Sequence, residues 1–217
     1  MSASRVLKTL KFIKAQIKDY IVPSVTQVSK SHDPYQILVS CILSLRTKDK
    51  TTIQASQRLF KIADKPESVL KLTVGKMQRL IYPVGFYRNK SRAILSLSKK
   101  LLEDFSGKVP DSLNELLELN GVGRKTANLV LGLGFGIPAI CVDTHVHRIS
   151  NRLGWVKTSS PFQTELVLQK IIPRREWIEL NTALVTFGQN LCFPVSPFCS
   201  KCNVYGFCKR RKVDKSR

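Results

Sequence analysis

The feature that most constrains this chain is a group of four cysteines near the end of the sequence. They have the spacing C-x6-C-x2-C-x5-C and fall within 17 residues, in the segment CFPVSPFCSKCNVYGFC. Thiolates this close can surround one tetrahedral zinc ion or one 4Fe–4S cluster. Zinc sites more often use two C-x2-C pairs, and here there is one, so the spacing favours a cluster. The predicted metal ligands are Cys192, Cys199, Cys202 and Cys208.

The other two cysteines lie in the apolar stretches SCIL and AICV, so we expect Cys41 and Cys141 to be buried small hydrophobic residues. No apolar signal-peptide core is visible. No apolar run reaches the roughly 18 residues that a membrane span needs. We therefore expect a reducing compartment and no membrane partner, and in such a compartment clustered thiols bind metal rather than form disulfides.

The net charge points to a polyanionic partner. The sequence holds 36 Lys and Arg against 15 Asp and Glu, a formal net charge of +21. An excess of this size favours binding to nucleic acid. A ribosomal-type or merely basic protein is the alternative that charge by itself leaves open.

Apolar residues recur at helical spacing along almost the whole chain, which predicts an all-α fold. Asp33-Pro34 and Ser160-Pro161 each combine an N-cap residue with a proline at the first helical position. Only short extended pieces such as PAICV resemble strands. Besides the helix that begins at Pro161, the pattern predicts helices at about 35–45, 49–62, 66–71, 74–81, 87–105, 111–119 and 175–190.

The two ends of the sequence are basic. Near the start, Leu7, Leu10, Ile13 and Ile17 form a helical stripe with lysines beside it. A transit peptide is one interpretation, and a basic amphipathic helix docked on the protein is the favoured one. The final segment, KRRKVDKSR, is expected to be a loose charged tail.

The segment SLNELLELNGVGRKTANLVLGLG predicts a helix, a tight turn and a second helix. Gly121 and Gly123 permit backbone conformations that other residues avoid. They also leave the N–H groups of the turn exposed at a helix N-terminus, which is a ready anion site. With Arg124 beside it, this helix-hairpin-helix is expected to grip a DNA phosphate without reading the base sequence.

Lys125 stands where a lysine is locally unfavourable, because a helix N-terminus carries positive partial charge. That charge, the neighbouring Arg124 and partial burial would all lower the lysine pKa from its usual value of about 10.4. A lowered pKa suits a nucleophilic amine, which must be deprotonated to react. The alternative is that Lys125 is a second phosphate-contacting cation beside Arg124. The spacing alone does not favour either role.

Asp143 follows a short apolar piece in AICVDTHVHRISNR and is predicted to cap a helix. A capping carboxylate stays ionised, so it can stabilise an oxocarbenium-like centre or accept a proton from an amine. Because its charge would raise the pKa of a nearby Lys125, the pair is useful only if Asp143 takes the proton during reaction. His145 and His147 do not share a helix face, which argues against a metal pair. His145 is expected to line the pocket near Asp143, and His147 to be solvated or on DNA.

Taken together, GVGRKTANLVL, VDTH and the cysteine spacing resemble the endonuclease III family of helix-hairpin-helix Gly/Pro-Asp DNA glycosylases. The resemblance implies a six-helix barrel domain with the helix-hairpin-helix at 27–137. It implies a helical iron–sulfur cluster domain made of 1–26 and 138–217, and a DNA-binding cleft between the two. Lys125 falls on the family's Schiff-base lysine and Asp143 on its catalytic aspartate. The cysteines fall on the ligands of a 4Fe–4S cluster that is structural.

The function implied is that of a bifunctional enzyme of base excision repair. It would remove oxidised pyrimidines from duplex DNA and nick the abasic site by β-elimination through a lysine Schiff base. Its partner would be double-stranded DNA with damaged bases or abasic sites, and it would act as a monomer inside the cell, with the DNA. One alternative is a monofunctional mismatch glycosylase of the same superfamily, where the lysine is typically replaced. The other is a non-catalytic DNA-binding module that is stabilised by a structural zinc ion.

Two further features concern DNA contact. SLRTKD matches the loop that enters the gap left by the flipped base, where similar enzymes commonly have glutamine and this chain has Arg46. Phe86 matches a wedge position that inserts opposite the gap. The loop between Cys192 and Cys199 is basic in the bacterial form and uncharged here, so Arg174, Arg175 or the run at 209–212 is expected to supply that charge.

Overall fold

The computed structural model describes residues 3–217, which are mostly helical and contain no strand. The all-α prediction is confirmed, while the strand-like piece at 138–142 has no regular secondary structure. None of the helices in this described part is long and apolar enough to cross a bilayer.

The chain divides into two compact units. One unit combines the chain up to Val22 with Pro138–Arg217, and the other is Pro23–Ile137. The first boundary lies after Val22 rather than after residue 26, because helix α2 (Ser24–Val28) packs against the helices that follow it. We call the two units the cysteine unit and the hairpin unit.

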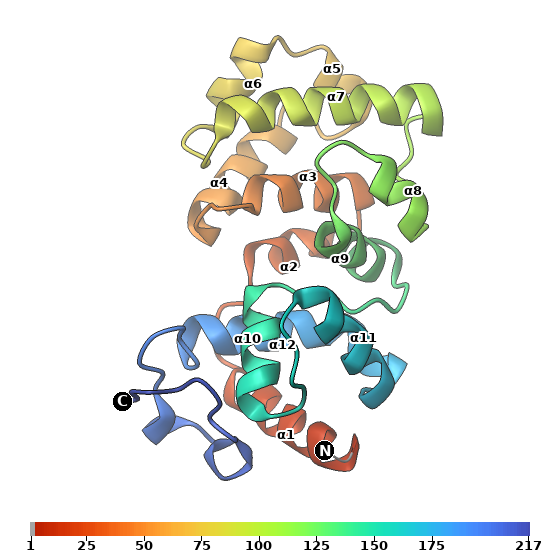
Figure 1. Cartoon of the computed structure of the whole chain (residues 1–217). Coiled ribbons are helices and arrows are strands. Elements are labelled where there is room, and N and C mark those ends of the chain that lie inside the picture. The colour runs from red at the N-terminus through yellow and green to blue at the C-terminus, as the bar shows by residue number, and fades with distance from the viewer. Residues whose placement is uncertain (1–2) are drawn as a thin grey trace. The chain divides into compact units, whose positions relative to one another are not determined.

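The hairpin unit is built around one helix. Helix α3 packs against α2, α4, α7 and α9, and it lies at the centre of this unit (Figure 1). Its sequence, PYQILVSCILS, is apolar on nearly every side, as a central helix requires. Its start is fixed by Asp33, whose carboxylate accepts hydrogen bonds from the backbone N–H groups of Tyr35 at 2.8 Å and Gln36 at 3.2 Å. The helices are α2, α3 (Pro34–Ser44), α4 (Asp49–Phe60), α5 (Pro66–Leu70), α6 (Val74–Ile81), α7 (Tyr87–Phe105), α8 (Leu113–Glu118) and α9 (Arg124–Phe135), with a short turn η1 (Ser29–Ser31).

The cysteine unit packs around α12, which contacts both α10 and α1. Buried residues from these three helices form one continuous apolar core, which includes Leu10, Ile149, Leu184 and Phe187. The helices are α1 (Ala3–Gln16), α10 (Thr144–Leu153), α11 (Pro161–Ile171) and α12 (Trp177–Asn190), with short turns η2 (Arg174–Glu176), η3 (Cys199–Lys201) and η4 (Tyr205–Phe207).

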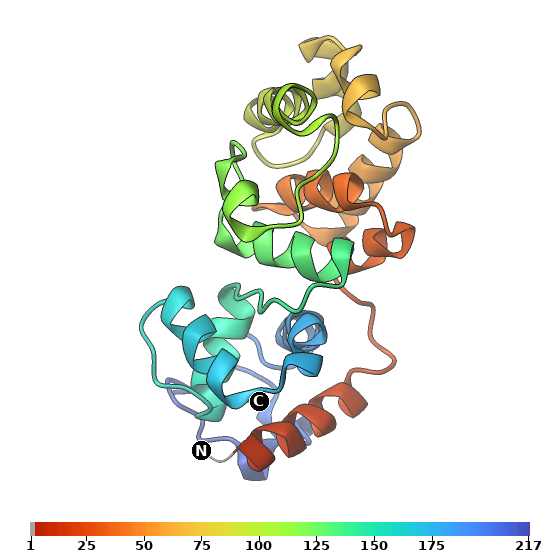
Figure 2. The same cartoon turned by 90° about the vertical axis from the view of Figure 1, so that its right-hand side faces the viewer.

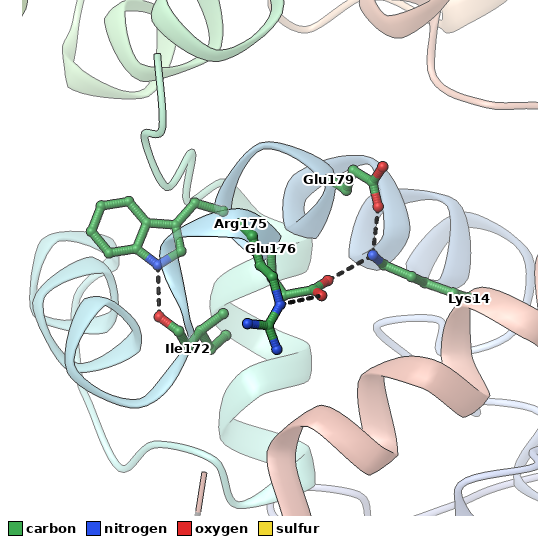
Figure 3. Close-up of polar contacts among 6 residues, drawn as sticks. Lys14, Ile172, Arg175, Glu176 and Glu179 are labelled. Carbon is green, nitrogen blue, oxygen red and sulfur yellow. Dashed lines mark hydrogen bonds and ion pairs between the residues drawn. The ribbon is translucent and has the colours of Figure 1, made fainter. Parts of the chain in front are cut away.

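Helix α1, red in Figure 2, is a docked amphipathic helix. Val6, Leu10 and Ile13 recur at helical spacing and are all buried in the core of the cysteine unit. On the neighbouring face, the ammonium of Lys14 pairs with Glu176 at 2.7 Å and with Glu179 at 2.5 Å (Figure 3). The structure therefore supports the docked-helix interpretation of this basic segment.

Candidate functional site

The predicted helix-hairpin-helix is present in the hairpin unit. Helices α8 and α9 pack against each other, and the turn between them is closed by a hydrogen bond from the Val122 N–H to the Leu119 carbonyl at 3.0 Å. Gly121 has a φ of +83°, a conformation that favours glycine. Gly123 is the N-cap of α9 and has an ordinary φ of −94°.

The space beside both glycines is open. A Cβ atom added to either Gly121 or Gly123 would meet no other atom of the protein within 4 Å. Backbone strain accounts for a glycine at 121, but neither strain nor packing requires one at 123. The absence of a side chain at 123 lets another molecule approach the first N–H groups of α9, as a phosphate-binding turn needs.

Lys125 is the second residue of α9, directly after Arg124, and it is half-buried. Helix α9 packs against α3, which carries the fully buried Cys41. Burial raises the pKa of Cys41 to about 11, and the charge of Lys125 opposes that rise. The lysine thus lies near a thiol that is neutral at pH 7 and cannot act as an anionic partner for its ammonium.

Asp143 caps α10 in the cysteine unit, as predicted. Its Oδ1 accepts a hydrogen bond from the Val146 N–H at 2.9 Å, and the residue is half-buried. Arg148 lies one turn further along, and the Asp143 charge helps to counter the burial that lowers the Arg148 pKa. The Asp143 carboxylate therefore has both a backbone N–H and a guanidinium as neighbours.

The two histidines of α10 are held in different ways. The Nδ1 atom of His145 lies 3.1 Å from the Arg148 guanidinium. A Cβ at Gly188 would come within 2.4 Å of the same ring nitrogen, so α12 needs a glycine there to admit the ring. His147, which was expected to be solvated or on DNA, is half-buried. Its Nδ1 lies 2.7 Å from the Thr164 hydroxyl, so it ties α10 to α11.

The four predicted ligands line one cavity of about 30 Å³. Cys192 follows α12, Cys199 begins the turn η3, and Cys202 and Cys208 directly follow η3 and η4. Apolar side chains, including Leu153, Phe187 and Val204, form most of the remaining wall, which Arg152 and Arg210 also line. Among residues 3–217, no group of three or more His, Cys, Asp or Glu is arranged to hold a single metal ion.

Hydrogen-bond donors next to the cavity suit thiolate ligands, whereas burial by itself favours the neutral thiols. The Arg152 guanidinium lies 3.5 Å from the Cys192 sulfur, and the Arg210 N–H lies 3.3 Å from the Cys208 sulfur. Burial raises the pKa of Cys202 to about 11 and also raises that of Cys208. Four cysteine side chains around one largely apolar pocket form a donor set that fits an iron–sulfur cluster.

The basic end of the sequence is ordered, which corrects the expectation of a loose tail. The Arg217 N–H donates to the Pro197 carbonyl at 2.8 Å, and the Ser200 N–H donates to the Arg217 carbonyl at 3.0 Å. The Arg217 guanidinium lies 4.1 Å from the centre of the Phe198 ring. A cation therefore stands on the loop between Cys192 and Cys199, whose own sequence carries no charge. That Arg174, Arg175 or the run at 209–212 supplies charge for DNA contact stays a prediction.

Arg46 and Phe86 lie in two neighbouring loops of the hairpin unit, and both side chains are exposed. The Arg46 guanidinium carbon is 5.7 Å from the centre of the Phe86 ring. Lys125, Arg46 and Phe86 thus belong to the hairpin unit, whereas Asp143, His145 and the cysteines belong to the cysteine unit.

Comparison with known proteins gives one consistent result. A family model described as HhH-GPD superfamily base excision DNA repair protein matches residues 39–174. Endonuclease III of Thermotoga maritima is 47% identical over 180 residues, which cover 83% of this chain and 84% of that protein. Endonuclease III of Bacillus subtilis is 36% identical over 211 residues, 96% of each chain. A solved structure of a trapped endonuclease III–DNA covalent intermediate, an estranged-adenine complex, matches with a TM-score of 0.85 at 32% identity and 97% coverage of both chains.

Proposed function

Because the chain belongs to the HhH-GPD superfamily of base excision DNA repair proteins, we propose that Lys125 is the nucleophile and Asp143 the proton acceptor of its reaction. The protein is a bifunctional DNA glycosylase and AP lyase. One observation carries the assignment of the nucleophile. Lys125 is half-buried in the first turn of α9, directly after an open glycine turn, in a chain similar to an enzyme that was trapped covalently on DNA.

The glycine turn and its cation hold the DNA backbone in this proposal. A phosphate approaches the N–H groups at the start of α9, where Gly121 and Gly123 leave space, and Arg124 adds a charge. This contact is independent of base sequence, so it fixes the register of the strand and does not select the lesion. Arg46, Phe86 and His145 contact the DNA near the extruded nucleotide.

The chemistry follows from an amine and a carboxylate that act at one sugar. The Lys125 amine attacks C1′, the bond from C1′ to the base breaks, and the base leaves as an anion that takes up a proton from solvent. Asp143 accepts the proton that the amine loses. The sugar ring then opens to a Schiff base on Lys125. Loss of a proton from C2′ breaks the C3′–O bond, which nicks the strand 3′ to the site.

The proposed substrate is duplex DNA with an oxidised pyrimidine or an abasic site. Extruding a base costs a few kcal/mol, and a damaged, poorly stacked base costs less, which is one source of selectivity. The proposal places the enzyme where the cell keeps its DNA. Its action as a monomer stays a prediction.

The proposed cofactor is a 4Fe–4S cluster on Cys192, Cys199, Cys202 and Cys208. The support is the donor set: four thiols around one apolar cavity, with Arg152 and a backbone N–H directed at two of the sulfurs. When bound, the cluster holds the last segment of the cysteine unit together. The catalytic steps use only side chains of the protein and the DNA.

Product analysis tests the function. A duplex with one thymine glycol is incubated with the enzyme and analysed with and without subsequent alkali. A bifunctional enzyme nicks the strand without alkali and leaves an unsaturated aldehyde at the 3′ end. A monofunctional glycosylase leaves an intact abasic site, so nicking that appears only after alkali contradicts the proposal.

A further inference from the structure

Two residues of the hairpin unit with exposed side chains have an unusual backbone conformation, with positive φ. Arg46, between α3 and α4, has a φ of +52°, and Phe86, just before α7, has a φ of +58°. Phe86 is 60% exposed, and its ring lies beside the Arg46 guanidinium. Residues other than glycine persist in this region only where their surroundings hold them there, and such positions concentrate at functional sites.

The backbones of the two loops touch at Gly85. A Cβ at this position would lie 2.6 Å from the carbonyl oxygen of Arg46, so only glycine allows the approach. The Gly85 N–H donates a hydrogen bond to the hydroxyl of Thr47 at 3.1 Å. The conformations of Arg46 and Phe86 are therefore coupled through direct contact between their neighbours.

The buried side chain of Lys90 stabilises this contact between the two loops. It lies in the first turn of α7 and is only 7% exposed. Its ammonium donates to the Leu43 carbonyl at 2.9 Å, to the Leu45 carbonyl, and to the Thr47 hydroxyl at 3.2 Å. A lysine ammonium has three N–H donors, and all three acceptors belong to the end of α3 and the loop that carries Arg46.

A second role as nucleophile does not suit this arrangement. Burial lowers the pKa of Lys90 to about 8, but every donor of its ammonium is directed at an acceptor within its own unit. The three acceptors also explain how a buried cation is retained, since an unpaired buried charge is strongly unfavourable. The backbone N–H of the same residue donates to the Phe86 carbonyl at 3.0 Å, so Lys90 holds both loops.

We propose that Lys90 is a positioning residue, which locks the loops of Arg46 and Phe86 into one rigid wedge that fills the gap left by the extruded nucleotide. The inference rests on the proposed function, because that function opens the gap. Lys90 acts through the two exposed side chains and does not touch the DNA. Displacing a positioned group by about 1 Å can reduce a rate about a hundredfold, so the effect of loosening the wedge is measurable.

The test compares two substrates, of which only one has a gap to fill. Lys90→Met removes the ammonium and keeps a long side chain. Lys99→Met, on the same helix at a position whose side chain is 67% exposed, is the matched control. We measure single-turnover base excision on a lesion duplex, and borohydride trapping on a single-stranded oligonucleotide with one abasic site. The expected result for Lys90→Met is a loss of about tenfold or more on the duplex, with single-strand trapping at the wild-type level.

A second pair of variants guards against loss of fold in Lys90→Met. Thr47→Val removes the hydroxyl that Gly85 and Lys90 share, and Thr47→Ser keeps it. Thr47→Val should show the same selective loss on the duplex, and Thr47→Ser should restore the rate. Parallel losses on both substrates, or no loss in either Lys90→Met or Thr47→Val, overturn the positioning role. Wild-type protein that neither excises the base from the duplex nor traps on the single strand overturns the proposed function itself and the positioning role with it.

Discussion

Asp143 is assigned two roles, and two substitutions separate them. Its carboxylate caps α10 through one hydrogen bond to the Val146 N–H at 2.9 Å, and it is proposed to accept the lysine proton. Asparagine caps a helix about as well as aspartate, whereas alanine at an N-cap costs about 1 kcal/mol. For a protein of this size that corresponds to a fall of about 2–4 °C in the melting temperature. We expect this fall for Asp143→Ala and almost none for Asp143→Asn.

The two Asp143 variants should differ in melting temperature but lose activity to a similar extent. An amide cannot accept the proton, and proton transfer by a positioned group contributes about 10²–10⁴-fold to a rate. Both variants should therefore lose single-turnover base excision by about that factor, measured well below their melting temperatures. Asp33→Ala is the control, because Asp33 caps α3 in the same way and has no proposed role in catalysis. Wild-type excision by Asp143→Asn would show that the carboxylate is only a helix cap.

Three further predictions concern the DNA contacts and the cluster. Arg46→Gln should flatten a preference for lesions opposite guanine, because a bidentate contact between arginine and guanine is worth about 1–3 kcal/mol; an equal loss with all four opposite bases would mean that Arg46 contacts only phosphate. Gly121→Ala should destabilise the protein by about 1 kcal/mol, since its φ is +83°, whereas Gly123→Ala should chiefly weaken binding to abasic DNA; unchanged binding by Gly123→Ala contradicts the phosphate contact. Cys202→Ser should give protein that is colourless by visible absorption and poorly soluble by sedimentation, because loss of the cluster destabilises the fold. A soluble, fully active variant would show that folding does not require the cluster.

Helix positions and helix caps are predictable from the sequence, because they depend on residues that lie close together in the chain. The helices predicted at 74–81 and 87–105 are confirmed, because periodicity and turn residues act within a few positions of each other. The caps predicted at Asp33, Asp143 and Ser160 each make the expected side-chain hydrogen bond. Such contacts span three residues or fewer, so the sequence contains them directly.

The contacts of Lys90 and Arg217 were not predicted from the sequence, because they join segments that are far apart in the chain. Lys90 stands on the buried stripe of α7 with Ile94, Leu97 and Leu101, and a lysine at an apolar position was a usable signal. Its partners in the loop after α3 were not predictable, because they depend on how two helices pack. The same holds for Arg217, which stacks on an aromatic ring that precedes it in the chain by 19 positions.

The central claim is that the amine of Lys125 bonds to the sugar, and locating the adduct tests it most directly. Wild-type protein is trapped with borohydride on a duplex that contains one abasic site, the complex is digested, and the modified peptide is identified by mass spectrometry. We predict that the sugar remnant is attached to Lys125, and that Lys125→Ala yields no trapped complex. A remnant on any other amine, or undiminished trapping by Lys125→Ala, would contradict the account.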